Sequence, residues 1–175
     1  MKQKIAPTSV EVPVGDDDVI VSKTDLSGRI TYVNRTFMRI SNFAEREVLG
    51  KQHNVVRHPD MPRGVYRLMW DTLKAEREFF GIVKNLTSDG HFYWVLANVT
   101  ADRDDDGQSV GYFSVRRHAP ASTVRAVSDL YAQMMKIERE AGPAEAPAAS
   151  AQFLRRLLEE QKTTYDRFVL GLYQQ

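Results

Sequence analysis

Polar and apolar positions alternate in short runs near the start of the chain and again in its middle. Runs of this period, rich in β-branched and aromatic side chains and bounded by turn residues, are typical of half-buried strands. The turn Asp25–Gly28 joins two of the runs and the loop Leu86–Gly90 joins two more, as in hairpins. The sequence predicts strands at residues 19–24, 29–33, 79–85, 91–101 and 109–117.

Between the second and third runs the spacing of apolar residues becomes helical. Asn34 suits the N-cap of one short helix, and residues 42–50 predict a second that Gly50 ends. A longer amphipathic helix is predicted over 63–76, where apolar residues recur three or four positions apart. Together these elements predict an α+β fold: a five-stranded antiparallel sheet with short helices on one face, followed by C-terminal helices.

The last third of the chain has a different pattern. Two amphipathic helices are predicted, Ser122–Glu140 and Ser150–Leu172, with a break rich in Ala, Gly and Pro near 141–149. Each helix needs a surface to pack on, and the pattern leaves three open: the other helix, the sheet, or a second copy of the chain. The predicted division is an N-terminal cap at 1–17, the main domain at 18–118 and a helical extension at 119–175.

Composition excludes several classes of function. The chain has 175 residues, 42% of them hydrophobic, and a formal net charge of +1. Such a small charge argues against general attraction to nucleic acid. There is no cysteine, so disulfides, thiolate metal sites and cysteine nucleophiles are excluded. The sequence shows no bilayer-length apolar run and no signal-peptide core, so we expect no membrane segment and a cytoplasmic protein.

Candidate chemistry is concentrated in the polar segment His53–Pro62, which holds two histidines, an arginine and an aspartate. Residues before proline avoid the helical region, so a short helix can extend to Val56 but not easily past Arg57. Irregular polar segments often carry binding groups; the alternative is a surface loop with a salt bridge between Arg57 and Asp60. No metal site is predicted, because the spacing of His53 and His58 suits one poorly in a segment broken by Pro59, and no third strong ligand is obvious.

The order of predicted elements over 18–117 resembles a PAS domain. Separated runs agree in order and spacing with the PAS domain of bacterial aerotaxis receptors, and the likeness covers about the first two-thirds of the chain. These runs are His53–Pro62, Met69–Trp70, Thr72–Lys74, Gly81–Asn85 and Tyr93–Trp94. Receptors of that family continue into a membrane anchor and a helical signalling domain that this sequence does not contain. We therefore expect either the sensor region of a larger receptor or a stand-alone PAS protein.

The resemblance implies a non-covalently bound FAD whose redox state is the signal for energy taxis. It implies that the following positions line or affect the flavin pocket: Asn34, His53, Arg57, His58, Asp60, Trp70 and Asn85. Their chemistry suits a flavin, which needs a flat aromatic wall, amides at its carbonyl and imide edge, and basic groups at its pyrophosphate. Asn34 also suits a purely structural N-cap, and Asp60 is expected to hold Arg57 in place.

The sequence predicts a binding protein rather than an enzyme, since no second set of acid and base groups accompanies these residues. Haem held by a histidine ranks below flavin. In the favoured hypothesis the redox state biases the sheet and, through Arg116 and Arg117, the first tail helix. A chemotaxis signalling domain or partner protein then receives the signal. The alternative is an interaction module with no ligand or another ligand, and a homodimer formed by the tail helices is expected.

Overall fold

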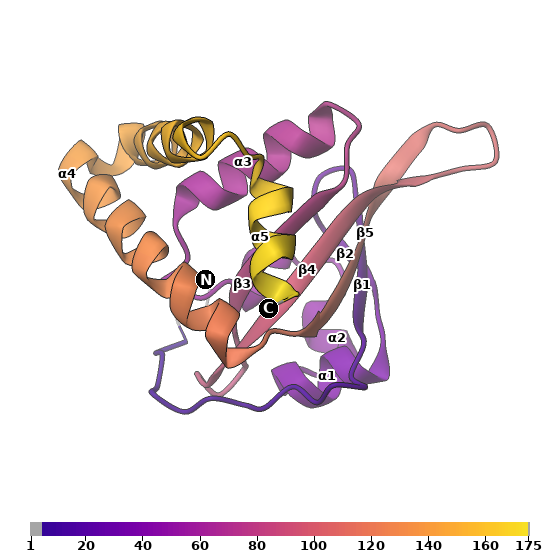
Figure 1. Cartoon of the computed structure of the whole chain (residues 1–175). Helices are drawn as coiled ribbons and strands as arrows, with labels where there is room; N and C mark the ends of the chain where they lie inside the picture. The colour runs from indigo at the N-terminus through magenta and orange to yellow at the C-terminus, as the bar shows by residue number, and fades with distance from the viewer. Residues whose placement is uncertain (1–4, 175) are drawn as a thin grey trace.

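A single antiparallel sheet lies at the centre of the protein, with its strands in the order β2-β1-β5-β4-β3 (Figure 1). This computed structural model describes residues 5–174. The strands are β1 Ile20–Asp25, β2 Ile30–Val33, β3 Phe79–Leu86, β4 Phe92–Arg103 and β5 Ser109–His118. The predicted fold class is confirmed, and every predicted strand is present with ends shifted by at most two residues.

Four short helices connect β2 to β3: α1 Arg35–Ser41, α2 Glu45–Val48, the 3₁₀ helix η1 His53–Val56, and α3 Arg63–Lys74. The side chain of Asn34 accepts a hydrogen bond from the amide of Phe37, as expected of an N-cap. Gly50, with a φ of 73°, follows the end of α2 in a conformation that favours glycine. The helix η1 ends before the prolines, in agreement with the predicted limit at Arg57.

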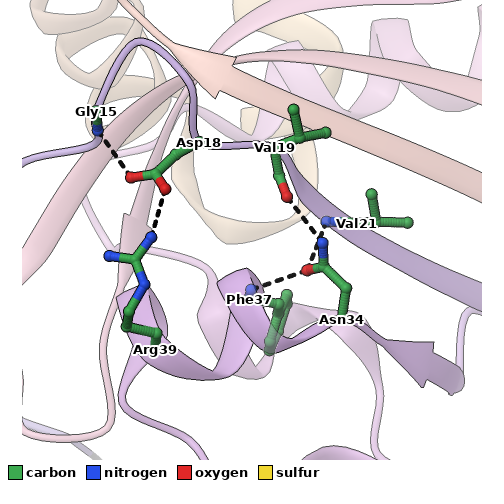
Figure 2. A network of polar contacts seen from close by, with 7 residues as sticks. All are labelled: Gly15, Asp18, Val19, Val21, Asn34, Phe37 and Arg39. Atoms are coloured by element: carbon green, nitrogen blue, oxygen red, sulfur yellow. Dashed lines mark hydrogen bonds and ion pairs between the residues drawn. The ribbon is translucent and has the colours of Figure 1, made fainter.

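The N-terminal segment is extended and follows the start of β4. The amide of Val12 donates to the carbonyl of Phe92 over 2.7 Å. Asp18 then accepts a hydrogen bond from the amide of Gly15 and binds the guanidinium of Arg39 on α1 (Figure 2). The described part of the predicted cap is thus attached to the sheet and to α1; its residues 1–4 lie outside the described residues.

The tail differs from its prediction in two places. The break expected near 141–149 is confined to Gly142, whose φ of 78° and ψ of 168° interrupt the long helix α4, Ala121–Glu160. Pro143 suits the first turn of a resumed helix, and the alanines after it favour helix. The prediction of a single second helix over 150–172 is wrong. The long helix ends at Glu160, and a turn containing Lys162 at a φ of 51° leads into α5, Tyr165–Tyr173.

The tail helices pack on their own chain, which answers the question that the sequence left open. α4 lies beside α3 and the outer edge of β3, and α5 lies against β3 and α4 (Figure 1). The hydroxyl of Tyr131 donates to the carbonyl of Ile82 on the β3 edge over 2.6 Å. Val127, Met134 and other apolar residues of the tail belong to the same core as the sheet. Within residues 5–174, no helix is both long and apolar enough to cross a membrane.

Candidate functional site

A cavity of about 250 Å³ lies between the sheet, η1 and α3. Its sheet side comes from β1, β3, β4 and β5, and its other side from the segment Gln52–Arg57 and from α3. The residues from α3 are Tyr66, Met69, Trp70 and Leu73. They recur at intervals of three, one and three residues, which places them on one face of the helix. The amphipathic pattern of α3 therefore makes one wall of a cavity as well as part of a core.

Aromatic side chains make the apolar part of the wall. The rings of Trp70 and Tyr112 meet edge to face, with centroids 5.2 Å apart. Phe79 also lines the cavity, and its ring stacks with that of Tyr165 of α5, with centroids 5.7 Å apart. Flat apolar walls of this kind suit a planar ring system.

Arg116 provides the polar end of the cavity. It lies on β5, and only 4% of its surface is exposed. Its Nη2 donates to Nε2 of His53 over 2.6 Å and to Oγ of Ser22 over 2.9 Å. Its Nη1 has no hydrogen-bond partner among the described residues, and neither has the nearby Oγ of Ser114. Arginine stays charged in proteins, so the cavity contains a buried cation with an unused donor.

His53 is uncharged in this setting. Desolvation, and secondly the charge of Arg116, lower the pKa of the His53 imidazole from 6.5 to about 3. Its Nε2 accepts from Arg116 and so carries no proton, which leaves the ring proton on Nδ1. Ser22 lies 2.9 Å from the same nitrogen. The polar end of the cavity thus combines one guanidinium with a neutral imidazole and a hydroxyl.

Arg57 lines the cavity from the segment after η1. The centre of its guanidinium lies 4.1 Å from the centre of the Tyr66 ring, and Nη2 donates to the carbonyl of Met61 over 3.2 Å. The expectation that Asp60 holds Arg57 is wrong. Asp60 instead accepts a hydrogen bond from Lys84 of β3 over 2.8 Å, because the turn at Pro59 directs the two side chains of this segment to different neighbours.

The structure brings four of the seven predicted site residues together. His53, Arg57, Trp70 and Asn85 all line the cavity. Asn85 is buried on β3, and its Nδ2 has no hydrogen-bond partner among residues 5–174. These four residues come from η1, the residue that follows it, α3 and β3, so the fold brings one short segment together with a helix and a strand that come later in the chain.

Asn34 lies outside the cavity lining and has a structural position. Its Oδ1 accepts from the amides of Val21 and Phe37, and its Nδ2 donates to the carbonyl of Val19 (Figure 2). These three contacts tie the beginning of α1 to the adjoining strand β1. Both polar atoms of the Asn34 side chain are thus engaged in these local contacts.

His58 and Asp60 also lie outside the lining. His58 is buried, with its Nδ1 accepting from the amide of Asp60 over 3.1 Å and its ring edge to face with Phe92. Desolvation, and then the charge of Lys84, lower the pKa of His58 to about 4. The pair belongs to the packing of the segment against β3 and β4. Within the described residues, no group of three or more His, Asp or Glu side chains is arranged to hold a metal ion.

Arg116 lines the cavity but was not among the predicted site residues. Tyr112, Ser114 and Arg116 alternate along β5 and point to one side of the sheet, the side that lines the cavity. The sequence contained one signal, because a charged residue at an inward position of a strand conflicts with a purely apolar core. Tyr66 was not among the predicted cavity residues either, although its ring supports Arg57.

A family model described as the PAS fold matches residues 30–116. Residues 30–116 are a PAS domain. The chain is 41% identical to the aerotaxis receptor of Escherichia coli (strain K12) over 124 residues, which are 71% of this chain and 24% of the receptor. It is 28% identical to the nitrogen fixation regulatory protein of Klebsiella pneumoniae over 59% of this chain and 21% of that protein.

Solved structures agree on the fold. A light-oxygen-voltage domain studied with a flavin analogue has a TM-score of 0.55 and 22% identity, covering 63% of this chain and 83% of its own. The dark structure of the blue-light photoreceptor Aureochrome1 LOV has a TM-score of 0.52 and 22% identity, and the match covers 69% of this chain and 86% of that one. The chain spans about a quarter of the length of the curated relatives named above.

Proposed function

We propose that the PAS domain binds FAD in the cavity and acts as a redox sensor for energy taxis. The observation that carries this proposal is the buried Arg116, which faces the cavity without a carboxylate partner and with Nη1 free among the described residues. A buried cation costs several kcal/mol unless it is paired. A ligand that presents acceptor groups to Arg116 would offset this cost.

The carbonyl and imide edge of an isoalloxazine ring fits these donors. Its acceptors suit Arg116, and its imide N–H and remaining carbonyl suit an amide such as Asn85. Trp70, Tyr66 and Phe79 offer the flat surfaces that the ring needs. When bound, the flavin supplies one- and two-electron redox chemistry.

The size of the cavity limits how FAD binds. Ligand pockets commonly hold ~300–1,000 Å³, and this cavity of about 250 Å³ has room for a ring system rather than for a whole dinucleotide. The ribityl and pyrophosphate portion would therefore extend through the opening. Arg57 is half-buried at the cavity and is suited to the phosphates. FAD rather than FMN is proposed because the resemblance to aerotaxis receptors implies FAD, and the chain is 41% identical to one such receptor over 124 residues.

The signalling role is supported by the relatives. One is named a receptor and another a regulatory protein, so we propose a cytoplasmic sensor without enzymatic activity. In this proposal residues 18–118 sense and residues 119–175 transmit to a chemotaxis signalling domain or partner protein. A homodimer would have to use surfaces other than the apolar faces of α4 and α5, which pack inside the chain.

The test is the visible absorption spectrum of the purified protein after incubation with excess FAD, recorded before and after dithionite. Flavin bands that remain after gel filtration and bleach on reduction are the expected result. A Soret band would instead indicate haem. A colourless protein that is folded and dimeric would contradict the proposal and favour a PAS interaction module.

A further inference from the structure

Glu138 is a buried carboxylate of α4 that the proposed function does not use. Only 8% of its surface is exposed. Its Oε1 accepts a hydrogen bond from the amide of Gly64 over 3.0 Å and another from the hydroxyl of Ser150 over 2.5 Å. It makes no salt bridge within the part of the chain that the structure describes. A buried, unpaired carboxylate is costly to keep, so these two contacts call for an explanation.

The contact with Gly64 supplies a missing cap. The first amides of a helix have no partner within it and favour a negative charge nearby. The N-cap of α3 is Pro62, which has no side-chain acceptor, and the first turn of α3 has no acidic residue. Glu138 therefore provides from another helix what the sequence of α3 itself lacks.

The contact with Ser150 spans the interruption of α4. Glu138 precedes Gly142, where the helix is interrupted, and Ser150 follows it. Both halves of α4 meet the beginning of α3 at Gly64, where an added Cβ would lie 2.6 Å from the amide of Ala151. We call Gly64, Glu138 and Ser150 the α3–α4 joint. The joint excludes any side chain at position 64 and holds three helical segments together.

The joint is close in structure to the cavity wall. Tyr66 and Trp70 lie in the first two turns of α3 after Gly64. Burial lowers the pKa of Arg57, while the charge of Glu138 opposes that shift. A movement of α3 at the joint would thus displace two side chains of the wall and alter the surroundings of a third.

We propose that Glu138 is a positioning residue that couples the cavity helix α3 to both halves of α4. The arrangement of α4 then determines where Tyr66 and Trp70 stand in the cavity. Because coupling between two sites is reciprocal, a ligand that fixes α3 also fixes the second half of α4. This last consequence rests on the proposed function; the coupling of the two helices does not.

Hydrogen exchange of the ligand-free chain tests the coupling. In Glu138→Ala the amides of 63–74 and of 143–160 are expected to exchange roughly tenfold faster or more, since a buried donor loses its acceptor. Amides of β4 and β5 should keep their rates. The matched control is Glu140→Ala, an exposed acid two residues along the same helix. Three results would overturn the proposal: faster exchange in α4 alone, no change in the exchange rates, or an equal increase in the control.

Glu138→Gln provides the same test in milder form if Glu138→Ala does not fold. Glutamine keeps an acceptor and the shape but removes the charge, so a smaller rise in the same two segments is expected. Glu140→Gln is its control, and a rise in only one of the segments would contradict the coupling.

A second arm uses FAD as the probe. In the unsubstituted chain FAD should slow exchange at 143–160, and in Glu138→Gln this slowing should be lost or reduced severalfold while the flavin spectrum remains. Equal slowing in both proteins would refute the ligand-linked part. If neither protein binds FAD, the proposed function fails, and the ligand-free measurement alone decides the coupling of α3 and α4.

Discussion

At the scale of single residues, the environment of Arg116 is the most informative feature of the protein. Its guanidinium is buried against a neutral imidazole and a hydroxyl rather than a carboxylate. Folding alone does not favour such an arrangement, because an apolar side chain would fill the same space at lower cost. The residue is thus better explained by a ligand than by stability.

Replacing Arg116 with methionine should separate binding from stability. FAD affinity is expected to fall ~10- to 150-fold, because hydrogen bonds to charged groups contribute ~1.5–3 kcal/mol. The free energy of unfolding of the ligand-free protein should stay the same or rise, since His53 and Ser22 still pair with each other over 2.9 Å. Fluorescence titration with FAD and urea denaturation measure the two effects.

Arg117→Met is the matched control, since Arg117 is the exposed neighbour of Arg116 on the same strand. It should bind FAD like the unsubstituted protein. Equal affinities of all three proteins would show that the ligand does not contact Arg116.

At the scale of elements, the outer edge of β3 determines how the tail is placed. Edge strands offer unpaired backbone groups that invite association with other chains. Here the carbonyl of Ile82 accepts from Tyr131, and the amide of Lys84 donates to the sulfur of Met61 over 3.3 Å. The hydroxyl of Tyr165 lies 2.6 Å from that of Tyr131, so α4 and α5 share one contact with the edge.

Tyr131→Phe should weaken this attachment. It removes the partner of a buried carbonyl and of the Tyr165 hydroxyl, which predicts a loss of ~1–3 kcal/mol in the free energy of unfolding. Tyr173→Phe is the control, because Tyr173 is only partly buried near the end of α5. Urea denaturation gives both values, and an effect of Tyr131→Phe no larger than that of the control would show that the edge contact is not stabilising.

At the scale of the whole molecule, the sheet and the tail share one core. Apolar residues of β4, α4 and α5 belong to a single buried cluster, so local changes should be felt in the stability of the entire chain. Two histidines, the partly buried His53 and the buried His58, lie in this unit, and desolvation lowers the pKa of both.

This burial predicts a pH dependence of stability. The folded pKa values of about 3 for His53 and about 4 for His58 lie below the ordinary 6.5. Below pH ~6.5 the unfolded chain therefore binds protons that the folded chain does not. As the pH is lowered from 6.5, the free energy of unfolding should decrease by up to ~1.4 kcal/mol per pH unit for each histidine. Urea denaturation between about pH 7 and pH 5 measures the slope.

Substitution identifies the groups responsible. Replacing both His53 and His58 with asparagine should flatten this slope. His118→Asn, at the more exposed end of β5, should leave it unchanged. A slope that persists after His53 and His58 are both replaced would assign the effect to other groups.

The linear pattern of residues was enough to predict the strands and the helices between them. Alternation of apolar and polar residues set the five strands, and the helical spacing over 63–74 set α3 with one face toward the sheet. Local backbone chemistry set the N-cap at Asn34 and the end of η1 before the prolines. These features depend on neighbours within a few residues, so a linear pattern contains them. Whether residues 1–17, 18–118 and 119–175 act as separate units stays a prediction.

Which polar side chains meet, by contrast, depends on how the elements pack in three dimensions. Arg116 reaches His53 across 63 positions, Glu138 reaches Gly64 across 74, and Asp60 pairs with Lys84 rather than Arg57. Polar contacts of this kind depend on strand order, on helix placement and on which side chains burial leaves without water. None of these features follows from the spacing of residues along the sequence. For this reason the cavity and the α3–α4 joint could be recognised only in the folded chain.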